Sequence, residues 1–354
     1  MSNPTEAVPL PLVTQRAAHL RRGINLSHWY AQAIAPADYT PAHLETYMTD
    51  RDLELVAEMG FDHVRFTVNP APMLNLPADY LARLDRNVEK LLSLGLAVII
   101  DMHPEVNFKK WIATEEGSAA FVTFWGELAA HMAKFDESRT FLEVLNEPEV
   151  LDPKRWNTIQ NRAITAIRKG APRHTIIASG DGYSQLPMLE LLELPQERNL
   201  IANFHLYDPI AFTHQGATWS PPWAMSCQGM TYPSDPAFVR EFLKNVDDPE
   251  AVREIAAYAE EGWNPARYEV MIARAAEWGR ARGLALTCNE FGVYKMFAPR
   301  ACRLAWLHDV TGLLEKYGIG WTMWDYAGGF AVVRNENGRR QPDVELLQAV
   351  RLRA

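Results

Sequence analysis

Two glutamates, Glu147 and Glu290, have the position and the neighbours of a reacting pair. Each ends a strongly apolar run and directly follows an asparagine, in the triplets Asn-Glu-Pro and Asn-Glu-Phe. A carboxylate at the end of such a run is costly to bury unless it is paired or has a function. Two facing carboxyl groups suit cleavage of a glycosidic bond, in which one protonates the leaving oxygen and the other attacks the anomeric carbon or activates water. The alternative is that both are buried salt-bridge partners.

Polar side chains also end the other apolar runs of the chain. A cation near one of the two glutamates would keep it ionised, and Arg65 is the candidate. These side chains converge on one rim only if the runs are strands of a barrel, and a polar ring on that rim predicts a functional site. Besides the two glutamates, the ring consists of Asn25, His28, Arg65, His103, Asn146, Asp181, His205, Tyr207, Asn289, Trp324 and Asp325.

A metal centre is the rival chemistry. His103, His205 and His214 could bind a metal, but no His-x-His or His-Glu-x-x-His pair occurs on one element. The sequence therefore predicts neither a metal nor any other cofactor. A metal-dependent barrel hydrolase that uses these histidines remains an alternative.

The elements that must position these residues alternate along the chain. Short, continuous apolar runs are typical of parallel strands buried on both faces. Amphipathic segments that close on Gly, most of them opening on Pro, are typical of helices. This alternation predicts a single (β/α)8 barrel, with a doubly wound sheet as the alternative. The expected strands are 22–28, 62–68, 96–103, 140–147, 174–181, 200–207, 284–291 and 319–326, and the clearest helices are 78–95, 153–170, 265–283 and 299–318.

One connection, between Tyr207 and Leu284, is much longer than the others. It contains an extra helical stretch near 235–261 and several tryptophans, Trp219 among them. In a barrel this extended loop region after the sixth strand would lie on the face where active sites are built. We expect Trp219, and Trp29 after the first strand, to line a sugar-binding cleft there. The alternative is a surface loop without function.

Composition limits the class of protein. The chain has 354 residues, 48% of them hydrophobic and 22% charged, with a net charge of −9, three cysteines and eleven tryptophans. These values favour a folded protein, disfavour nucleic acid as a partner and give no disulfide framework. No run is long and apolar enough to span a membrane. The first twenty residues show no secretory signal, so we expect a cytoplasmic protein, or a secreted one whose leader has been removed. We assign 1–20 to an N-terminal extension and 21–354 to the catalytic domain; the sequence does not indicate the oligomeric state.

The strand ends together resemble the cellulase family, glycoside hydrolase family 5. The matching pieces occur in barrel order across nearly the whole chain: Arg65 in DHVRFTV, His103 in IIDMH, then FLEVLNEP, NFHLYDP, CNEFG and WTMWDY. The stretch FTHQGATW at 212–219 further resembles bacterial members that act on β-1,4-glucans.

The resemblance implies a role for each matching residue. Glu147 would be the general acid/base and Glu290 the nucleophile of a retaining mechanism, with Asn146 on the sugar 2-hydroxyl. Arg65 and Tyr207 would hold Glu290 in its ionised form, and His205 would lie beside Glu147. His103 would contact the sugar, and Trp324 would be the platform on which the sugar stacks.

The expected substrate is an oligo- or polysaccharide, most simply a β-1,4-glucan. A β-mannan, a β-1,3-glucan or a small β-glucoside remain open, because these substrates differ in contacts that a sequence does not contain. An inactive barrel that only binds sugar is the alternative outside enzymes.

Overall fold

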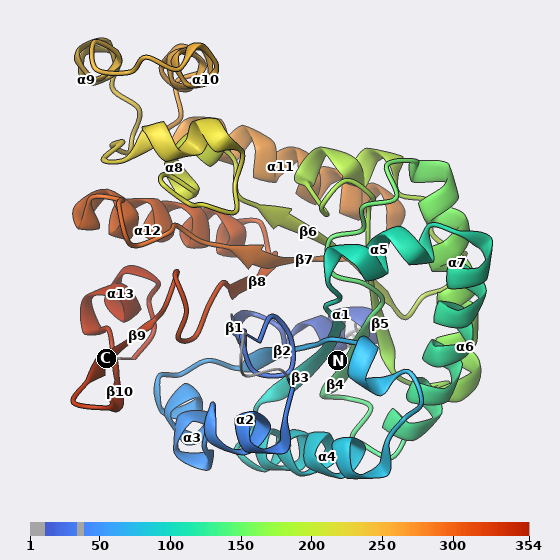
Figure 1. Cartoon of the computed structure of the whole chain (residues 1–354). Coiled ribbons are helices and arrows are strands. Elements are labelled where there is room, and N and C mark those ends of the chain that lie inside the picture. The colour runs from blue at the N-terminus through green and yellow to red at the C-terminus, as the bar shows by residue number, and fades with distance from the viewer. Residues whose placement is uncertain (1–10, 34–38, 354) are drawn as a thin grey trace, which may run out of the picture.

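The computed structural model describes residues 11–33 and 39–353, and its centre is a closed barrel of parallel strands in the order β1 to β8 (Figure 1). The predicted (β/α)8 fold is confirmed, and each expected strand overlaps an observed one. The strands are β1 Arg22–Asn25, β2 His63–Val68, β3 Ala97–Met102, β4 Thr140–Glu143, β5 Thr175–Ser179, β6 Leu200–Leu206, β7 Ala285–Phe291 and β8 Gly320–Met323.

Helices surround the barrel. Several of them begin at a Pro behind a capping side chain; α7, for example, starts at Pro153 behind the cap Asp152. The helices are α1 Leu12–Ala17, α2 Pro41–Thr46, α3 Asp50–Glu58, α4 Ala78–Ser93, α5 Val106–Ile112, α6 Glu115–Met132, α7 Pro153–Gly170, α8 Ile210–Thr213, α9 Pro236–Leu243, α10 Pro249–Glu260, α11 Pro265–Arg282, α12 Arg300–Lys316 and α13 Val344–Ala349, with 3-10 turns η1 Ala71–Met73, η2 Leu186–Leu191 and η3 Pro222–Cys227.

Alternation along each strand decides what enters the barrel. On β3, Ile99 belongs to a buried apolar cluster, and Asp101 and then His103 follow at the strand's period of two. One strand face therefore carries an apolar side chain, a carboxylate and an imidazole in succession toward the mouth of the barrel.

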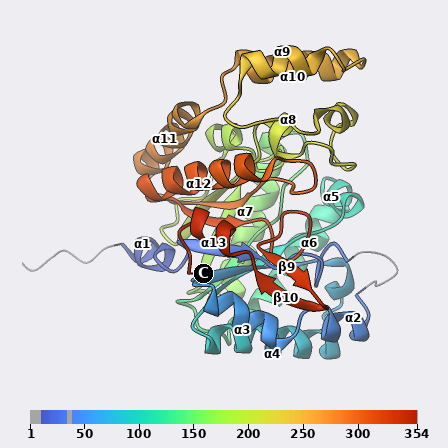
Figure 2. The same ribbon diagram turned by 90° about the vertical axis from the view of Figure 1, so that its left-hand side faces the viewer.

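The floor of the barrel is apolar and is closed by the N-terminal helix. Val13 of α1 and Leu20 pack with the inward side chains Ile99, Phe141 and Ile201. In Figure 2, α1 lies at the left-hand end of the barrel and α5, which follows β3, at the right-hand end. The division at residue 21 stays a prediction. Residues 1–10 lie outside the described part, and Val13, Ala17 and Leu20 pack on the barrel floor.

The long connection after β6 contains α8, η3, α9 and α10, and α9 and α10 stand out from the barrel beyond α8 (Figures 1 and 2). The single helical stretch expected near 235–261 is two helices, because α10 starts anew at Pro249 behind the cap Asp248. A hairpin of β9 Val333–Glu336 and β10 Arg339–Pro342 follows β8 and was not predicted. Among the described helices, none has the length and apolar character needed to cross a membrane.

Candidate active site

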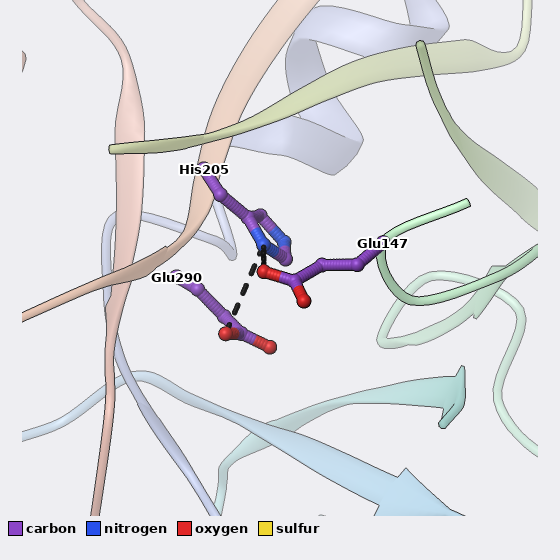
Figure 3. A group of neighbouring side chains, drawn as sticks. All are labelled: Glu147, His205 and Glu290. Carbon is purple, nitrogen blue, oxygen red and sulfur yellow. Dashed lines mark hydrogen bonds and ion pairs between the residues drawn. The ribbon is translucent and has the colours of Figure 1, made fainter. Parts of the chain in front are cut away.

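Glu147 and Glu290 face each other at the mouth of the barrel (Figure 3). Glu147 lies on the loop after β4 and Glu290 in β7. An oxygen of one carboxylate lies within 4.8 Å of an oxygen of the other, and a nitrogen of His205 lies within the same distance of each. The Glu147 side chain is 25% exposed and that of Glu290 is 6% exposed, so the pair opens to solvent mainly on the side of Glu147.

Glu290 is held by one cation and one hydroxyl. Arg65 Nη1 donates to Glu290 Oε1 at 2.6 Å, and Tyr207 Oη donates to Oε2 at 3.1 Å. Burial, together with the neighbouring Glu290 carboxylate, raises the pKa of Tyr207, so the phenol remains a donor. Each oxygen of Glu290 therefore has its own donor, which favours the ionised carboxylate.

Glu147 has a different environment. Its Oε1 lies 3.0 Å from Nδ1 of His205, which lies 3.8 Å from Glu290 Oε2. A register shift in the β6–β7 ladder between Phe204 and His205 places His205 opposite Glu290. Burial lowers the pKa of His205 to about 4, so this imidazole is neutral at neutral pH. A neutral imidazole can donate to the Glu147 carboxylate or accept from its acid form.

Arg65 contacts several buried polar side chains beneath the two glutamates. Its guanidinium is fully buried and forms a bidentate pair with Glu143, at 2.9 and 2.8 Å. Asp101 Oδ2 lies 3.0 Å from the same guanidinium. Burial opposes the charge of Arg65, but the surrounding carboxylates outweigh it and raise its pKa. Burial also raises the pKa of Asp101, to about 7, and that of Glu143.

His103, Asn146 and Trp324 form one wall of the site. The His103 ring stacks on Trp324 with centroids 5.5 Å apart and planes 16° apart. His103 Nδ1 lies 2.8 Å from Asp101 Oδ2, and its Nε2 lies 3.2 Å from Asn146 Nδ2. Asn146 Oδ1 accepts from Arg65 at 2.9 Å. The structure thus brings these predicted residues together around Glu147 and Glu290.

Two predicted residues lie behind the site rather than in it. Asn25 is fully buried, and its Oδ1 accepts from Arg65 Nη1 at 3.0 Å, so it supports the arginine from below. The expectation that Trp29 lines the cleft is wrong. Trp29 is 1% exposed; its indole stacks on Phe66 at 5.0 Å and donates to the carbonyl of Leu44, because the chain after β1 turns it into the core.

Trp219 belongs to an aromatic group at the edge of the site that the sequence did not reveal in full. It is 59% exposed, and its ring contacts Tyr294 edge-on at 4.8 Å. The ring centroid of Phe330 lies 6.5 Å from that of Trp219 and 6.1 Å from that of Tyr207. Phe330 therefore connects Trp219 to the residues around Glu290. Tyr294 and Phe330 follow β7 and β8 closely. Their short distance along the chain from Glu290 and Trp324 was the sequence signal that could have identified them.

The two glutamates are also where a cation could bind. In the described ranges, Glu147, His205 and Glu290 are the one group of His, Cys, Asp and Glu side chains whose ligand atoms lie close enough to hold a metal ion. The sequence prediction that catalysis uses no metal stays a prediction.

A closed (β/α)8 barrel with two carboxylates facing each other at its mouth is the arrangement expected of a barrel hydrolase. Comparison with known proteins names the family. The family model "Cellulase (glycosyl hydrolase family 5)" matches residues 35–329. The chain belongs to this family.

Named relatives agree with the family. Endoglucanase C of Acetivibrio thermocellus is 29% identical over 320 residues, which are 86% of this chain and 91% of that protein. Cellodextrinase A of Ruminococcus flavefaciens is 27% identical over 84% of this chain and 83% of its own length.

A solved structure of Thermotoga maritima Cel5A in complex with mannotriose is 25% identical, with a TM-score of 0.77, and covers 96% of this chain and 99% of that one. A second, in complex with cellobiose, is 24% identical with a TM-score of 0.78 over 96% and 99% of the two chains, and it supports the fold.

Proposed function

We propose that this protein is a retaining glycosidase that hydrolyses β-1,4-glucan through a covalent glycosyl-enzyme intermediate. The observation that carries the proposal is the separation of the two carboxylates, with oxygens within 4.8 Å. Retaining enzymes hold their carboxyl groups about 5–5.5 Å apart, whereas inverting enzymes leave about 6.5–9.5 Å for a water. The endoglucanase and cellodextrinase names of the relatives support β-glucan as the substrate.

The environments of the two acids divide their roles. Glu290, with its two donors, attacks the anomeric carbon as a carboxylate while Glu147 gives its proton to the leaving oxygen. Glu147, now ionised, takes a proton from a water, and that water attacks the anomeric carbon and frees Glu290. The proton that Glu147 gives away in the first step is replaced by one from water in the second, so both acids end in their starting states.

β-Mannan is the second candidate, and it has an observation of its own. The Cel5A structure with mannotriose covers nearly the whole of both chains. Glucose and mannose differ at the 2-hydroxyl, which we place against Asn146. Comparing kcat/KM for cellotetraose and mannotetraose separates the two candidates.

Proton NMR of cellotetraose hydrolysis tests the proposal. We expect the newly formed hemiacetal to appear first as the β-anomer. Glu290→Gln should abolish turnover, whereas Glu149→Gln, the same change two residues from Glu147, should leave the rate within about twofold. An α-anomer as first product, or normal turnover by Glu290→Gln, would refute the mechanism; the absence of wild-type turnover on every β-glycan would refute the function.

A further inference from the structure

Asp101 lies beneath the site and contacts two of its residues through a single oxygen. It is fully buried on the inward face of β3. Its Oδ2 lies 2.8 Å from His103 Nδ1 and 3.0 Å from Arg65 Nη2. Its Oδ1 is buried and has no hydrogen-bond partner among the described residues. Asp101 therefore acts on the site only through the contacts of Oδ2 with His103 and Arg65.

The hydrogen bonds above Asp101 have one consistent direction. A guanidinium only donates, so the atom of Asn146 that faces Arg65 Nη2 at 2.9 Å must be the amide oxygen. The amide nitrogen then points at His103 Nε2, 3.2 Å away, and that nitrogen must accept. His103 consequently carries its hydrogen on Nδ1 and donates it to Asp101 Oδ2.

We propose that Asp101 is a positioning residue, which acts through the tautomer of His103 to fix the side-chain amide of Asn146 for its contact with the sugar 2-hydroxyl. The kinetic part of this inference rests on the proposed function. With the other tautomer, His103 Nε2–H and the Asn146 amide would present two donors to each other. The amide would then lose the support that directs its remaining N–H into the site.

The surroundings of Asp101 support this role. Burial lowers the pKa of His103 to about 3, so the ring is neutral and its tautomer matters. Glu143 also pairs with Arg65, but its other partners are Asn203 and Asn289, not His103. Both carboxylates pair with Arg65, but of the two only Asp101 contacts His103, which makes Glu143 the control.

The kinetic test compares an aryl β-cellobioside with its analogue that lacks the 2-hydroxyl on the sugar next to the aryl group. Asp101→Ala should lose about tenfold in kcat on the full substrate with little change in KM, and lose much less on the 2-deoxy analogue. Asp101→Asn, whose amide oxygen can replace Oδ2, should recover most of the kcat that Asp101→Ala loses on the full substrate. Glu143→Gln should affect both substrates equally. Equal losses on both substrates for Asp101→Ala would overturn the inference.

Nitrogen-15 NMR of the wild-type protein tests the same inference without turnover and without any variant at Asp101. We expect the His103 signals to show a protonated Nδ1 and an unprotonated Nε2, with the assignment taken from the signals missing in His103→Gln. Hydrogen on Nε2 would overturn the inference. Failure of the wild type to hydrolyse the cellobioside would refute the proposed function and leave this tautomer result standing.

Discussion

At the scale of single residues, the site depends on how charge is distributed around Arg65. One guanidinium contacts Glu143, Asp101 and Glu290, all of them buried. Breaking a buried pair by removing one partner costs about 3–5 kcal/mol, because the other charge stays behind uncompensated. Glu147 is outside this set and has His205 as its neighbour instead. The two acids therefore have different hydrogen-bond partners.

Glu147→Ala should affect the two steps of the reaction unequally. An aryl glycoside with a good leaving group departs without a proton, so formation of the intermediate should remain fast and its hydrolysis should become limiting. Added azide can enter the space left by the carboxylate and attack the sugar, which should restore turnover and yield a β-glycosyl azide. Glu149→Ala should show neither the loss nor any response to azide. A Glu147→Ala enzyme whose rate is unchanged by azide would contradict the assignment.

His205 should make stability depend on pH. Its pKa is lowered to about 4 in the folded protein by burial, against about 6.5 when unfolded. The unfolded chain therefore binds more protons as the pH falls from about 6.5 toward 4. The contribution of the neutral His205 to stability is complete above this window and is lost on descending through it.

Urea unfolding at pH 7 and pH 5 measures this effect. Between these pH values the free energy of unfolding of the wild type should fall by about 2 kcal/mol more than that of His205→Gln. Parallel changes in the two proteins would show that the imidazole is not held neutral by burial.

At the scale of elements, the strands were predictable and the long connection was not. Strands such as β3 are buried on both faces, so their apolar runs are visible in the sequence. The strands expected to end at His103 and Glu147 end earlier, at Met102 and Glu143. Hydrogen bonds such as that from Asn146 N to Met102 O continue beyond these ends, although the regular strand geometry has stopped. The burial of Trp29 depends on packing against Phe66, far along the chain, and no local pattern records it.

The connection after β6 contains a buried side chain, Gln215, that makes four hydrogen bonds to its backbone. Its Nε2 donates to the carbonyls of Phe212 and Met230, and its Oε1 accepts from the amides of Gly229 and Met230. These bonds tie the segment before Trp219 to the segment after η3. The Gln215 amide thus joins the two ends of the loop that contains Trp219.

Gln215→Ala should loosen this loop without unfolding the barrel. Each buried backbone group left without a partner costs about 1–3 kcal/mol. Hydrogen exchange of the Gly229 and Met230 amides should accelerate at least tenfold, while the amides of β3 keep their rates. Gln228→Ala, an exposed glutamine of the same loop, is the control and should change neither. Unchanged exchange at Gly229 and Met230 would show that the loop does not depend on Gln215.

At the scale of the whole molecule, the apolar floor cluster and the two glutamates lie at opposite ends of the barrel. The floor is an apolar cluster that includes Val13, Leu20 and Phe141, whereas the mouth carries Glu147 and Glu290. The sequence predicted the barrel and most of the site because both repeat along the strands. It did not predict that α1 closes the floor, because a six-residue helix between Pro and polar residues has no strong signature.

Leu20→Ala should therefore reduce stability without reducing catalysis. Leu20 is fully buried, and such truncations cost about 2–5 kcal/mol. Chemical unfolding should show this loss, while kcat at 25 °C stays within about twofold of the wild type. Leu12→Ala, a 49% exposed position of α1, should cost less than about 0.5 kcal/mol. A large loss of kcat in folded Leu20→Ala would show that floor and mouth are coupled.

The most direct measurement of the central claim is covalent trapping. An activated 2-deoxy-2-fluoro-β-cellobioside slows the second step more than the first, so the enzyme should accumulate as a glycosyl ester. Mass spectrometry of the intact protein should show one added fluorocellobiosyl group, and peptide sequencing should place it on Glu290. A label on Glu147 or on another residue, or hydrolysis of the reagent without any covalent adduct, would contradict the assignment of Glu290 as nucleophile.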